Sequence, residues 1–364
     1  MNSRERFLTA INGGSPDRVP IVANLTVQVA EKLAKELNCE VGMVDSFLAT
    51  RISHRDILLK LGNDAVLIAA TRANAKKTYV AGNGNVVDEW GLEYKRVGLY
   101  DEAVVRPLAG CNSVEDLEAY DFPDPLAEGR WDFSEETVKR YKKDYGIIGD
   151  LEACIFELAW NLVGMEKFIM DMATGEEYID VLLDKLLDFS TACGLKMIEL
   201  GADMIWAGDD VGTQSGMMIS PAMWRSTFKP RLKKMFAAFK AANKDIKIAY
   251  HSCGSIVPVI DDLAEIGLDV LNPLQPMANG MELGGLYEKY KDKLLFFGAI
   301  DVQGILPHGT PEDVRAEVLR CIKATGGGKR YIIAPAHNIQ PDTSVENVYA
   351  FFEAAKEYGH AGNP

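Results

Sequence analysis

Residues 247–253 read KIAYHSC, a short apolar run that stops at a histidine and a cysteine. The run is continuous rather than alternating, which is typical of a parallel strand covered on both faces. Seven further runs share this character: VPIVAN (19–24), DAVLIAA (64–70), GIIGDLE (146–152), DMIWAG (203–208), DVLNPL (269–274), LLFFGAI (294–300) and YIIAPAH (331–337). Segments with helical periodicity lie between most of them. This alternation predicts an α/β fold, a (β/α)₈ TIM barrel, formed as a single domain over residues 1–364.

Some regions depart from this repeat. Residues 1–14 and 27–60 look helical, and we expect them to cover an end of the barrel. Residues 77–108 alternate with period two around a Gly-Asn-Gly turn, which predicts a β-hairpin insertion. A long helix is expected to begin after Ser220, a good N-cap residue, and to kink at Pro230.

Composition narrows the classes of partner. The chain has a net charge of −14 with neutral histidines, so we expect no nucleic-acid partner, because phosphate binding needs a basic face. No apolar stretch reaches the length of a membrane span, and the polar N-terminus does not resemble a signal peptide. The six cysteines are scattered and form no CxxC pair. We therefore expect a cytoplasmic protein with reduced thiols and no membrane partner.

Polar side chains stand where the expected strands end. In a barrel of this kind, functional groups gather at the carboxyl ends of the strands. The residues at these positions are Asn24, Asp150, Glu152, Asp209, Asp210, His251, Cys253, Asn272, Asp301, His337, Asn338 and Gln340. At least five strands would therefore contribute groups that can bind a metal or carry a proton.

The His-x-Cys pair is the strongest metal candidate. Side chains two residues apart in extended backbone point to the same side, so His251 and Cys253 would form half of a zinc site. His337, just past the last strand, is the expected third ligand. Glu152 is the first candidate for a fourth, followed by an aspartate of the 209–210 pair. The alternative is that Cys253 is a small buried apolar residue and His251 an internally hydrogen-bonded histidine.

Carboxylates at two strand ends suggest acid–base chemistry. Asp209 and Asp210 are adjacent on a glycine-rich loop, where a pair can have separated pKa values or support a metal. We predict that these two and Glu152 are catalytic. The alternative for the pair is that one aspartate caps the next turn while the other is solvated.

The expected substrate-binding residues are mostly large. Trp160 and Trp206 are predicted to wall an aromatic pocket, with Met217 and Met218 beside them and Asn272 at a neighbouring strand end. The alternative for each tryptophan is a place in the core.

Several motifs resemble one enzyme family. They are SRERFLTAINGGSPDRVPI (3–21), GDD (208–210), SPAMWRSTFKPRLKKM (220–235), HSCGSI (251–256), GAIDVQGIL (298–306) and APAHNIQPDTSVENVYA (334–350). Together they look like the uroporphyrinogen decarboxylase superfamily over nearly the whole chain. The resemblance implies a (β/α)₈ barrel, in agreement with the strand count.

Two branches of that superfamily differ at residues that can be compared. The decarboxylases grip a tetrapyrrole with an arginine-rich N-terminal loop, whereas IVANLTVQVA at 21–30 contains no arginine. The zinc-dependent, corrinoid-linked methyltransferases carry HxC on the fifth strand, matched here by His251 and Cys253. Their thiol-methylating members have a cysteine where this chain has His337. Replacing a thiolate by an imidazole makes zinc a better Lewis acid, which suits an oxygen leaving group.

The resemblance therefore implies a zinc-dependent methyltransferase that passes a methyl group from a small-molecule donor, an aromatic methyl ether, to cob(I)alamin. The chain lacks DxHxxG, by which many corrinoid carriers place a histidine under cobalt, so a corrinoid carrier protein is the implied partner. A methylcobamide-dependent transferase to a thiol or pterin, a uroporphyrinogen-type decarboxylase and a non-catalytic, metal-storing barrel remain as alternatives. The methyl donor and the oligomeric state, including a homodimer, stay open.

Overall fold

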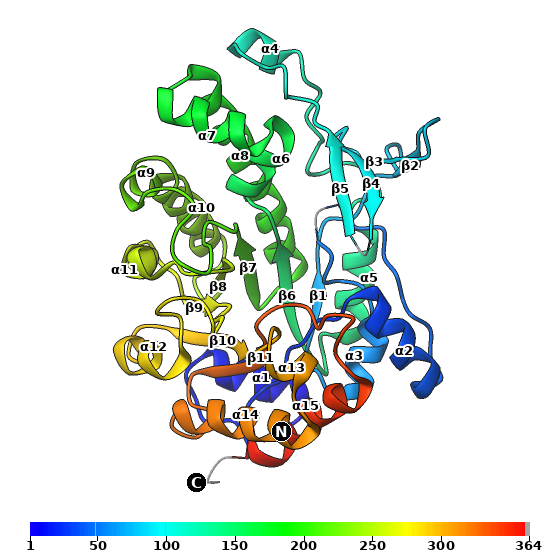
Figure 1. Cartoon of the computed structure of the whole chain (residues 1–364), viewed down its shortest axis with the longest axis vertical. Helices are drawn as coiled ribbons and strands as arrows, with labels where there is room; N and C mark the ends of the chain where they lie inside the picture. Colours follow the sequence, from blue (N-terminus) through cyan, green and yellow to red (C-terminus); the bar gives the residue numbers. More distant parts are fainter. Residues whose placement is uncertain (48, 99, 361–364) are drawn as a thin grey trace.

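The computed structural model describes residues 1–47, 49–98 and 100–360. Seven parallel strands form one curled sheet in the order β1-β6-β7-β8-β9-β10-β11 (Figure 1). Their bounds are β1 Ala65–Ile68, β6 Gly146–Leu151, β7 Met204–Gly208, β8 Lys247–His251, β9 Val270–Asn272, β10 Leu295–Ile300 and β11 Tyr331–Pro335. Each coincides with one of the expected apolar runs.

The eighth run, at 19–24, closes the barrel without regular strand pairing. It forms isolated parallel bridges to the β11 side, Ile21 to Ile333 and Leu25 to Ile339. On the β1 side, the Asn63 side chain accepts from the backbone N–H of Ala23 (3.0 Å) and donates to its carbonyl oxygen (2.9 Å). A side-chain amide thus replaces part of the ladder, and the expected (β/α)₈ barrel is confirmed.

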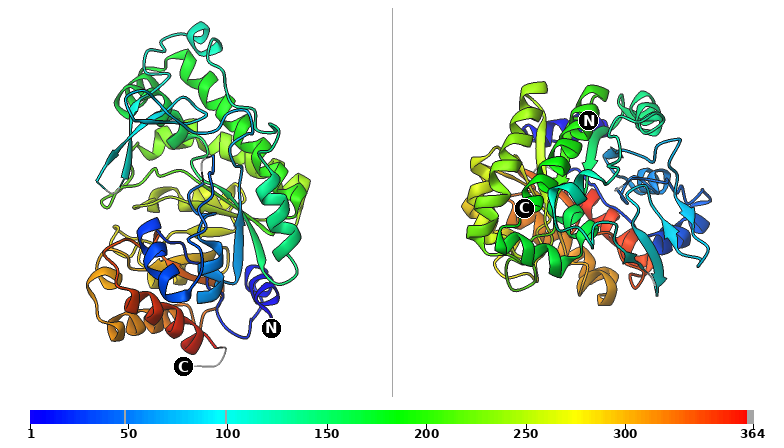
Figure 2. Two further views of the ribbon diagram at one scale, coloured as in Figure 1. Left: turned by 90° about the vertical axis from the view of Figure 1, so that its right-hand side faces the viewer. Right: turned by 90° about the horizontal axis from the view of Figure 1, so that it is seen from above.

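Helices surround this barrel (Figure 2). Their bounds are α1 Ser3–Ile11, α2 Val27–Leu37, α3 Arg55–Leu61, α4 Val114–Glu118, α5 Asp132–Tyr141, α6 Phe156–Val163, α7 Met165–Thr174, α8 Glu177–Leu200, α9 Pro221–Thr227, α10 Lys229–Ala242, η1 Val257–Val259 (a 3₁₀ turn), α11 Ile260–Glu265, α12 Leu283–Tyr290, α13 Ile305–His308, α14 Pro311–Ala324 and α15 Val345–Tyr358. The described helices include none with both the length and the apolar character needed to cross a bilayer.

The helix expected after Ser220 is broken near its proline. The Ser220 hydroxyl accepts from the N–H of Met223 at 3.1 Å and caps α9. Phe228 then separates α9 from α10, and Pro230 lies in the first turn of α10. A proline is favourable in a first turn and disruptive further inside, so the kink takes the form of a new helix start.

The insertion is larger than one hairpin. Strands β2 (Tyr79–Val80), β3 (Val86–Val87), β4 (Glu93–Val97) and β5 (Tyr100–Val105) form a four-stranded antiparallel sheet in chain order. Three glycines with positive φ stand at or near its turns, at positions 84, 91 and 98. Glycine adopts this conformation without steric cost, so each reversal of the chain has its own turn residue. The sequence predicted a single hairpin here, whereas the insertion is a sheet of four strands.

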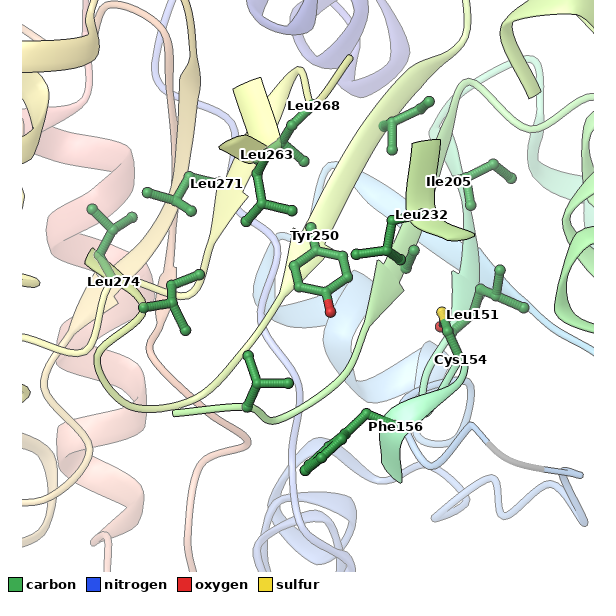
Figure 3. Close-up of a cluster of buried hydrophobic side chains, with 14 of the residues drawn as sticks. Leu151, Cys154, Phe156, Ile205, Leu232, Tyr250, Leu263, Leu268, Leu271 and Leu274 are labelled. Atoms are coloured by element: carbon green, nitrogen blue, oxygen red, sulfur yellow. Dashed lines mark hydrogen bonds between the residues drawn. The ribbon is translucent and has the colours of Figure 1, made fainter. Parts of the chain in front are cut away.

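Two layers of apolar side chains explain the continuous runs. Alternate residues of each strand point outward to the helices or inward along the barrel axis. On β8, Ile248 and Tyr250 point outward, and Figure 3 shows Tyr250 in a cluster with Leu232 of α10 and Leu263 of α11. Ala249 and His251 have the opposite parity and point into the barrel. The inward orientation of His251 therefore follows from the alternation of side chains along this strand.

The ends of the barrel differ. Helix α1 inserts Phe7 and Ile11 into the interior cluster and covers the amino end. At the carboxyl end the interior layer becomes polar, with Asn24, Asp150 and Asn272 all buried. The irregular segment between α2 and α3 brings Arg51 over this end, where it lines a pocket. The N-terminal region thus covers both ends, with a helix at one and a loop at the other.

Candidate functional site

A pocket opens at the carboxyl end of the barrel. It contains about 380 Å³ of empty space, part of it continuous with solvent. Its lining comes from nearly every strand of the barrel and comprises Val22, Asn24, Arg51, Glu152, Trp206, His251, Asn272, Phe297, Ala334, Pro335, Ala336, His337 and Asn338. Six of the twelve strand-end positions named from the sequence line this one space, namely Asn24, Glu152, His251, Asn272, His337 and Asn338.

Hydrogen bonds fix the orientation of His251. The Asn272 amide is oriented by two partners: Trp206 Nε1 donates to its Oδ1 at 2.9 Å, and its Nδ2 donates to the Phe297 carbonyl at 3.0 Å. His251 Nδ1 lies 2.6 Å from the same Oδ1. Because that oxygen only accepts, Nδ1 must carry the proton, and the lone pair resides on Nε2.

The free lone pair faces a thiol and a carboxylate. His251 Nε2 lies 3.4 Å from Cys253 Sγ and 3.6 Å from an oxygen of Asp210. The same carboxylate accepts from the backbone N–H of Cys253 at 2.7 Å, which holds the two loops together. The potential ligand atoms of all three residues lie within 4.8 Å of one another. Among the described residues, this is the compact group that could hold a metal ion.

The protonation states of the group suit a divalent cation. Burial, reinforced by the guanidinium of Arg51, lowers the pKa of His251 to about 4, so its imidazole is neutral at pH 7. Burial and the negative charge of Asp210 raise the pKa of Cys253. A bound cation would reverse the second effect and favour the thiolate. A neutral imidazole, a thiolate and a carboxylate form a donor set typical of zinc.

His337 lies at the rim of the same space. It lines the pocket with His251, and its Nδ1 is 3.3 Å from Gln340 Nε2. It is outside the compact group of Asp210, His251 and Cys253. Its role as a ligand stays a prediction, and Asp210 occupies the position nearest to the other two.

The two adjacent aspartates have different surroundings. Asp209 is buried and accepts from the backbone N–H groups of Ile155 (3.1 Å) and Glu157 (2.9 Å), so it caps the start of α6. Burial raises the pKa of Asp209 to about 7 despite these bonds. Asp210 points toward Cys253 instead. The capping role considered for one member of the pair is thus seen at Asp209.

Glu157 was not expected from the sequence. Its carboxylate accepts from the backbone N–H of Asp210 at 2.9 Å, and burial together with the charges of Asp210 and Asp209 raises its pKa well above the ordinary range. A signal for it was present, since an acidic residue in the first turn of a helix after a barrel strand lies at the functional end.

Arg51 is the second unexpected residue. Its Nη1 donates to Asp150 (3.3 Å) and its Nη2 to Glu152 (3.0 Å). Its guanidinium also lies 4.1 Å from the centre of the Trp206 ring. Burial alone would raise the pKa of Glu152, but Arg51 and the backbone N–H of Thr50 lower it overall. Glu152 is therefore an ionised, arginine-bound carboxylate at the pocket wall.

The expected substrate-binding residues divide into two groups. Trp206 and Asn272 line the pocket. Trp160 lies in α6 near the guanidinium of Arg106, 5.7 Å from its ring centre, and Met217 bridges to Gly212 on the β7 loop. These last two are not among the lining residues, so their substrate contacts stay predictions.

Comparison with known proteins gives a family match. The model of the uroporphyrinogen decarboxylase (URO-D) family matches residues 102–358. The methylcobamide:CoM methyltransferase MtbA of Methanosarcina acetivorans is 28% identical over 255 residues, 69% of this chain and 70% of that protein. MtaA of Methanosarcina barkeri, with the same description, is 27% identical over 61% of this chain and 62% of its own length. The family and the methyltransferase class expected from the motifs agree with these relatives.

Other matches support the same family and fold. A uroporphyrinogen decarboxylase of Pelodictyon phaeoclathratiforme is 27% identical over 48% of each chain. A solved structure described as a methyltransferase from Methanosarcina mazei superposes with a TM-score of 0.71 at 22% identity, covering 98% of this chain and 99% of that one. At this identity the superposition shows the shared barrel alone.

Proposed function

Because the chain belongs to the uroporphyrinogen decarboxylase family, we propose that it is a corrinoid-dependent methyltransferase. In this proposal it transfers a methyl group from an aromatic methyl ether to the cob(I)alamin of a partner protein. The observation that carries the proposal is the group of Asp210, His251 and Cys253, whose ligand atoms lie within 4.8 Å of one another at the barrel mouth. Family members named as methyltransferases support the same class.

The proposed zinc ligands are His251, Cys253 and His337, with Asp210 as the carboxylate within reach of the first two. Zinc, when bound, would supply a Lewis acid that stabilises negative charge on the oxygen losing its methyl group. Asn272 keeps the proton of His251 on Nδ1, so Nε2 stays available as a ligand atom. The N–H of Cys253 holds Asp210 in place.

The other predicted catalytic groups act around this centre. Asp209 holds the start of α6, and thereby Glu157, against the β7 loop. Glu152, directly after β6, and Arg51 line the pocket together. We propose that Asp210 orients the substrate oxygen and that the pocket side of Trp206 contacts the aryl group.

An open groove beside the pocket suits a docking partner. It is lined by Gln275, Val302, Gln303, His337, Gln340, Pro341 and Asp342, encloses about 1130 Å³ of space that includes open solvent, and shares His337 with the pocket. A corrinoid carried by another protein needs such an approach to the methyl group. This supports methyl transfer to an external cobalt centre.

Metal content and methyl transfer test the proposal together. Cys253→Ala should lose zinc and the transfer of methyl from 2-methoxyphenol to cob(I)alamin, because it removes the only sulfur of the ligand group. Cys193→Ala is the matched control, since Cys193 is buried in α8, outside that group. Unchanged zinc stoichiometry and rate in Cys253→Ala would contradict the proposal.

A second function is favoured by the names of the relatives, which are methylcobamide:CoM methyltransferases. It would move methyl from a corrinoid to a thiol. Incubating the zinc-loaded protein with methylcobalamin and a thiol separates the two functions, since only the second predicts demethylation of the corrinoid in this mixture.

A further inference from the structure

We propose that Glu157 is a positioning residue of the metal group, which holds the backbone of Asp210 and thereby turns its carboxylate toward the other two potential ligands. Those ligands are His251 and Cys253. This inference rests on the proposed function, since it concerns the metal centre that the proposed reaction would use. Three observations carry it: the spacing of the three donor atoms, the partners of the backbone around Asp210, and a backbone contact between two loops.

The spacing of the donor atoms fits one tetrahedral zinc ion. His251 Nε2 lies 3.4 Å from Cys253 Sγ and 3.6 Å from Asp210 Oδ1. Zinc bonds of about 2.0–2.3 Å at tetrahedral angles place a nitrogen about 3.6 Å from a sulfur and about 3.4 Å from an oxygen. The two separations in the structure agree with these values to about 0.2 Å. Asp210 can therefore act as a ligand as long as its carboxylate keeps this orientation.

The backbone around Asp210 is held from two sides. The N–H of the residue before it and the N–H of the residue after it both donate to residues 251–252 at the end of β8, at 3.0 Å each. The N–H of Asp210 itself donates to the carboxylate of Glu157 at 2.9 Å. Helix α6 thus supplies the partner of the middle N–H group, on the residue whose side chain faces the metal group.

Glu157 is fixed by the loop that it holds. Its own N–H donates to the carboxylate of Asp209 at 2.9 Å, while its carboxylate accepts from the next residue of the loop, Asp210. Two hydrogen bonds in opposite directions therefore join the first turn of α6 to the loop after β7. Asp210 Oδ1 in turn accepts from the N–H of Cys253 at 2.7 Å. A continuous series of hydrogen bonds runs from Glu157 to the metal group.

A backbone contact sets the distance between the loops that follow β7 and β8. Gly212 and Gly254 lie so close that a Cβ at position 254 would be 2.5 Å from a backbone atom of Gly212. This contact fixes the separation of the loops but leaves the peptide plane of Asp210 to be oriented by its own hydrogen bonds. Without an acceptor at position 157 this plane is free to turn, and the carboxylate turns with it.

Metal binding by matched variants tests the inference. The full-length protein is titrated with zinc alone, in competition with a chromophoric chelator. Glu157→Met keeps the length of the side chain but removes its oxygen acceptors, and we expect zinc to bind about tenfold more weakly, as is typical when a ligand loses its supporting hydrogen bond. Glu157→Ala is the second variant should this one fold poorly. Glu157→Gln keeps an oxygen acceptor and should restore most of the affinity. The control is Glu166→Met, which changes an exposed glutamate in the first turn of α7 and should leave zinc binding unaltered.

A double-mutant cycle separates positioning from a general structural role. In an Asp210→Ala background, Glu157→Met should cause no further loss of zinc affinity, because it acts through Asp210. Cobalt(II) in place of zinc gives a spectroscopic readout of the ligand set. The visible absorption of the cobalt-loaded protein should change in the same direction in Glu157→Met and in Asp210→Ala, since both take the carboxylate away from the metal.

Several outcomes would overturn the inference. They are wild-type zinc affinity in Glu157→Met, an equal loss of affinity with and without the Asp210 side chain, and failure of the wild type to bind zinc. These measurements need no methyl donor, so a metal site that depends on Glu157 but shows no turnover leaves the inference standing while the proposed activity fails. Methyl transfer by a protein whose zinc affinity does not depend on Glu157 has the opposite meaning.

Discussion

Two clusters of arginine and carboxylate lie at opposite ends of the barrel, and they differ in how completely their buried aspartate is hydrogen-bonded. At the amino end, Arg6 and Arg18 meet the buried Asp64 and the partly exposed Asp17, which also contacts the N-terminal ammonium of Met1. Asp64 is fully buried, and each of its oxygens accepts two hydrogen bonds, from the two arginines and from the N–H of Ile21. Both oxygens of Asp64 therefore have all their hydrogen-bond partners within the protein.

The cluster at the mouth is incomplete. There, Arg51 alone faces Asp150 and Glu152, and Asp150 Oδ2 has no partner among the described residues. Proteins generally satisfy buried polar groups, and exceptions concentrate at functional sites. The same residue types therefore form a fully paired carboxylate at the amino end and a partly unpaired one at the mouth.

The largest expected effect is on stability at the amino end. Asp64→Asn should lower the free energy of unfolding by about 3–5 kcal/mol, because it leaves two buried guanidinium groups without their shared carboxylate. Asp150→Asn should cost much less, since Arg51 keeps Glu152. Urea unfolding of both variants gives the comparison. Equal losses would mean that the two clusters have the same structural role.

Local sequence patterns predicted the barrel strands well and the insertion poorly, and both outcomes have a physical cause. The barrel strands were found because continuous apolar runs meet cores on both faces, as on β8 and β10. The four-stranded insertion was underestimated because β2 and β3 have two residues each, too few to show a period. Local pattern therefore specifies the barrel well and the insertion poorly.

The candidate site was predictable in part for a similar reason. Position 206 lies within β7, and positions 251 and 272 are the last residues of β8 and β9, where the parity of the strand determines which side chains point inward. Arg51 belongs to an irregular loop and reaches the pocket only through its long side chain, so no local pattern marks it. Trp160 was selected for its residue type rather than its position, and it is not among the residues that line the pocket.

The next effect concerns the hydrogen bond that orients His251. Asn272→Leu should weaken zinc binding about 10–100-fold, because the partner that fixes the imidazole tautomer is lost. Trp206→Phe keeps an aromatic ring but removes the N–H that orients Asn272, so an intermediate loss is expected. Competition with a chromophoric chelator measures both. An unaltered affinity in Asn272→Leu would show that this mouth network does not support a metal.

The smallest effect returns to the amino end and depends on pH. Hydrogen bonds from Arg6 lower the pKa of Asp17 below its ordinary value of 3.8, although the side chain is 36% exposed. An acid whose pKa is lowered by folding stabilises the native state above its unfolded pKa, and this contribution fades as the pH falls toward the folded pKa. The stability difference between the wild type and Asp17→Asn should therefore be constant above about pH 5 and shrink below about pH 4. Urea unfolding across this range measures it, and a difference that grew on acidification would show that Asp17 is not held by Arg6 in solution.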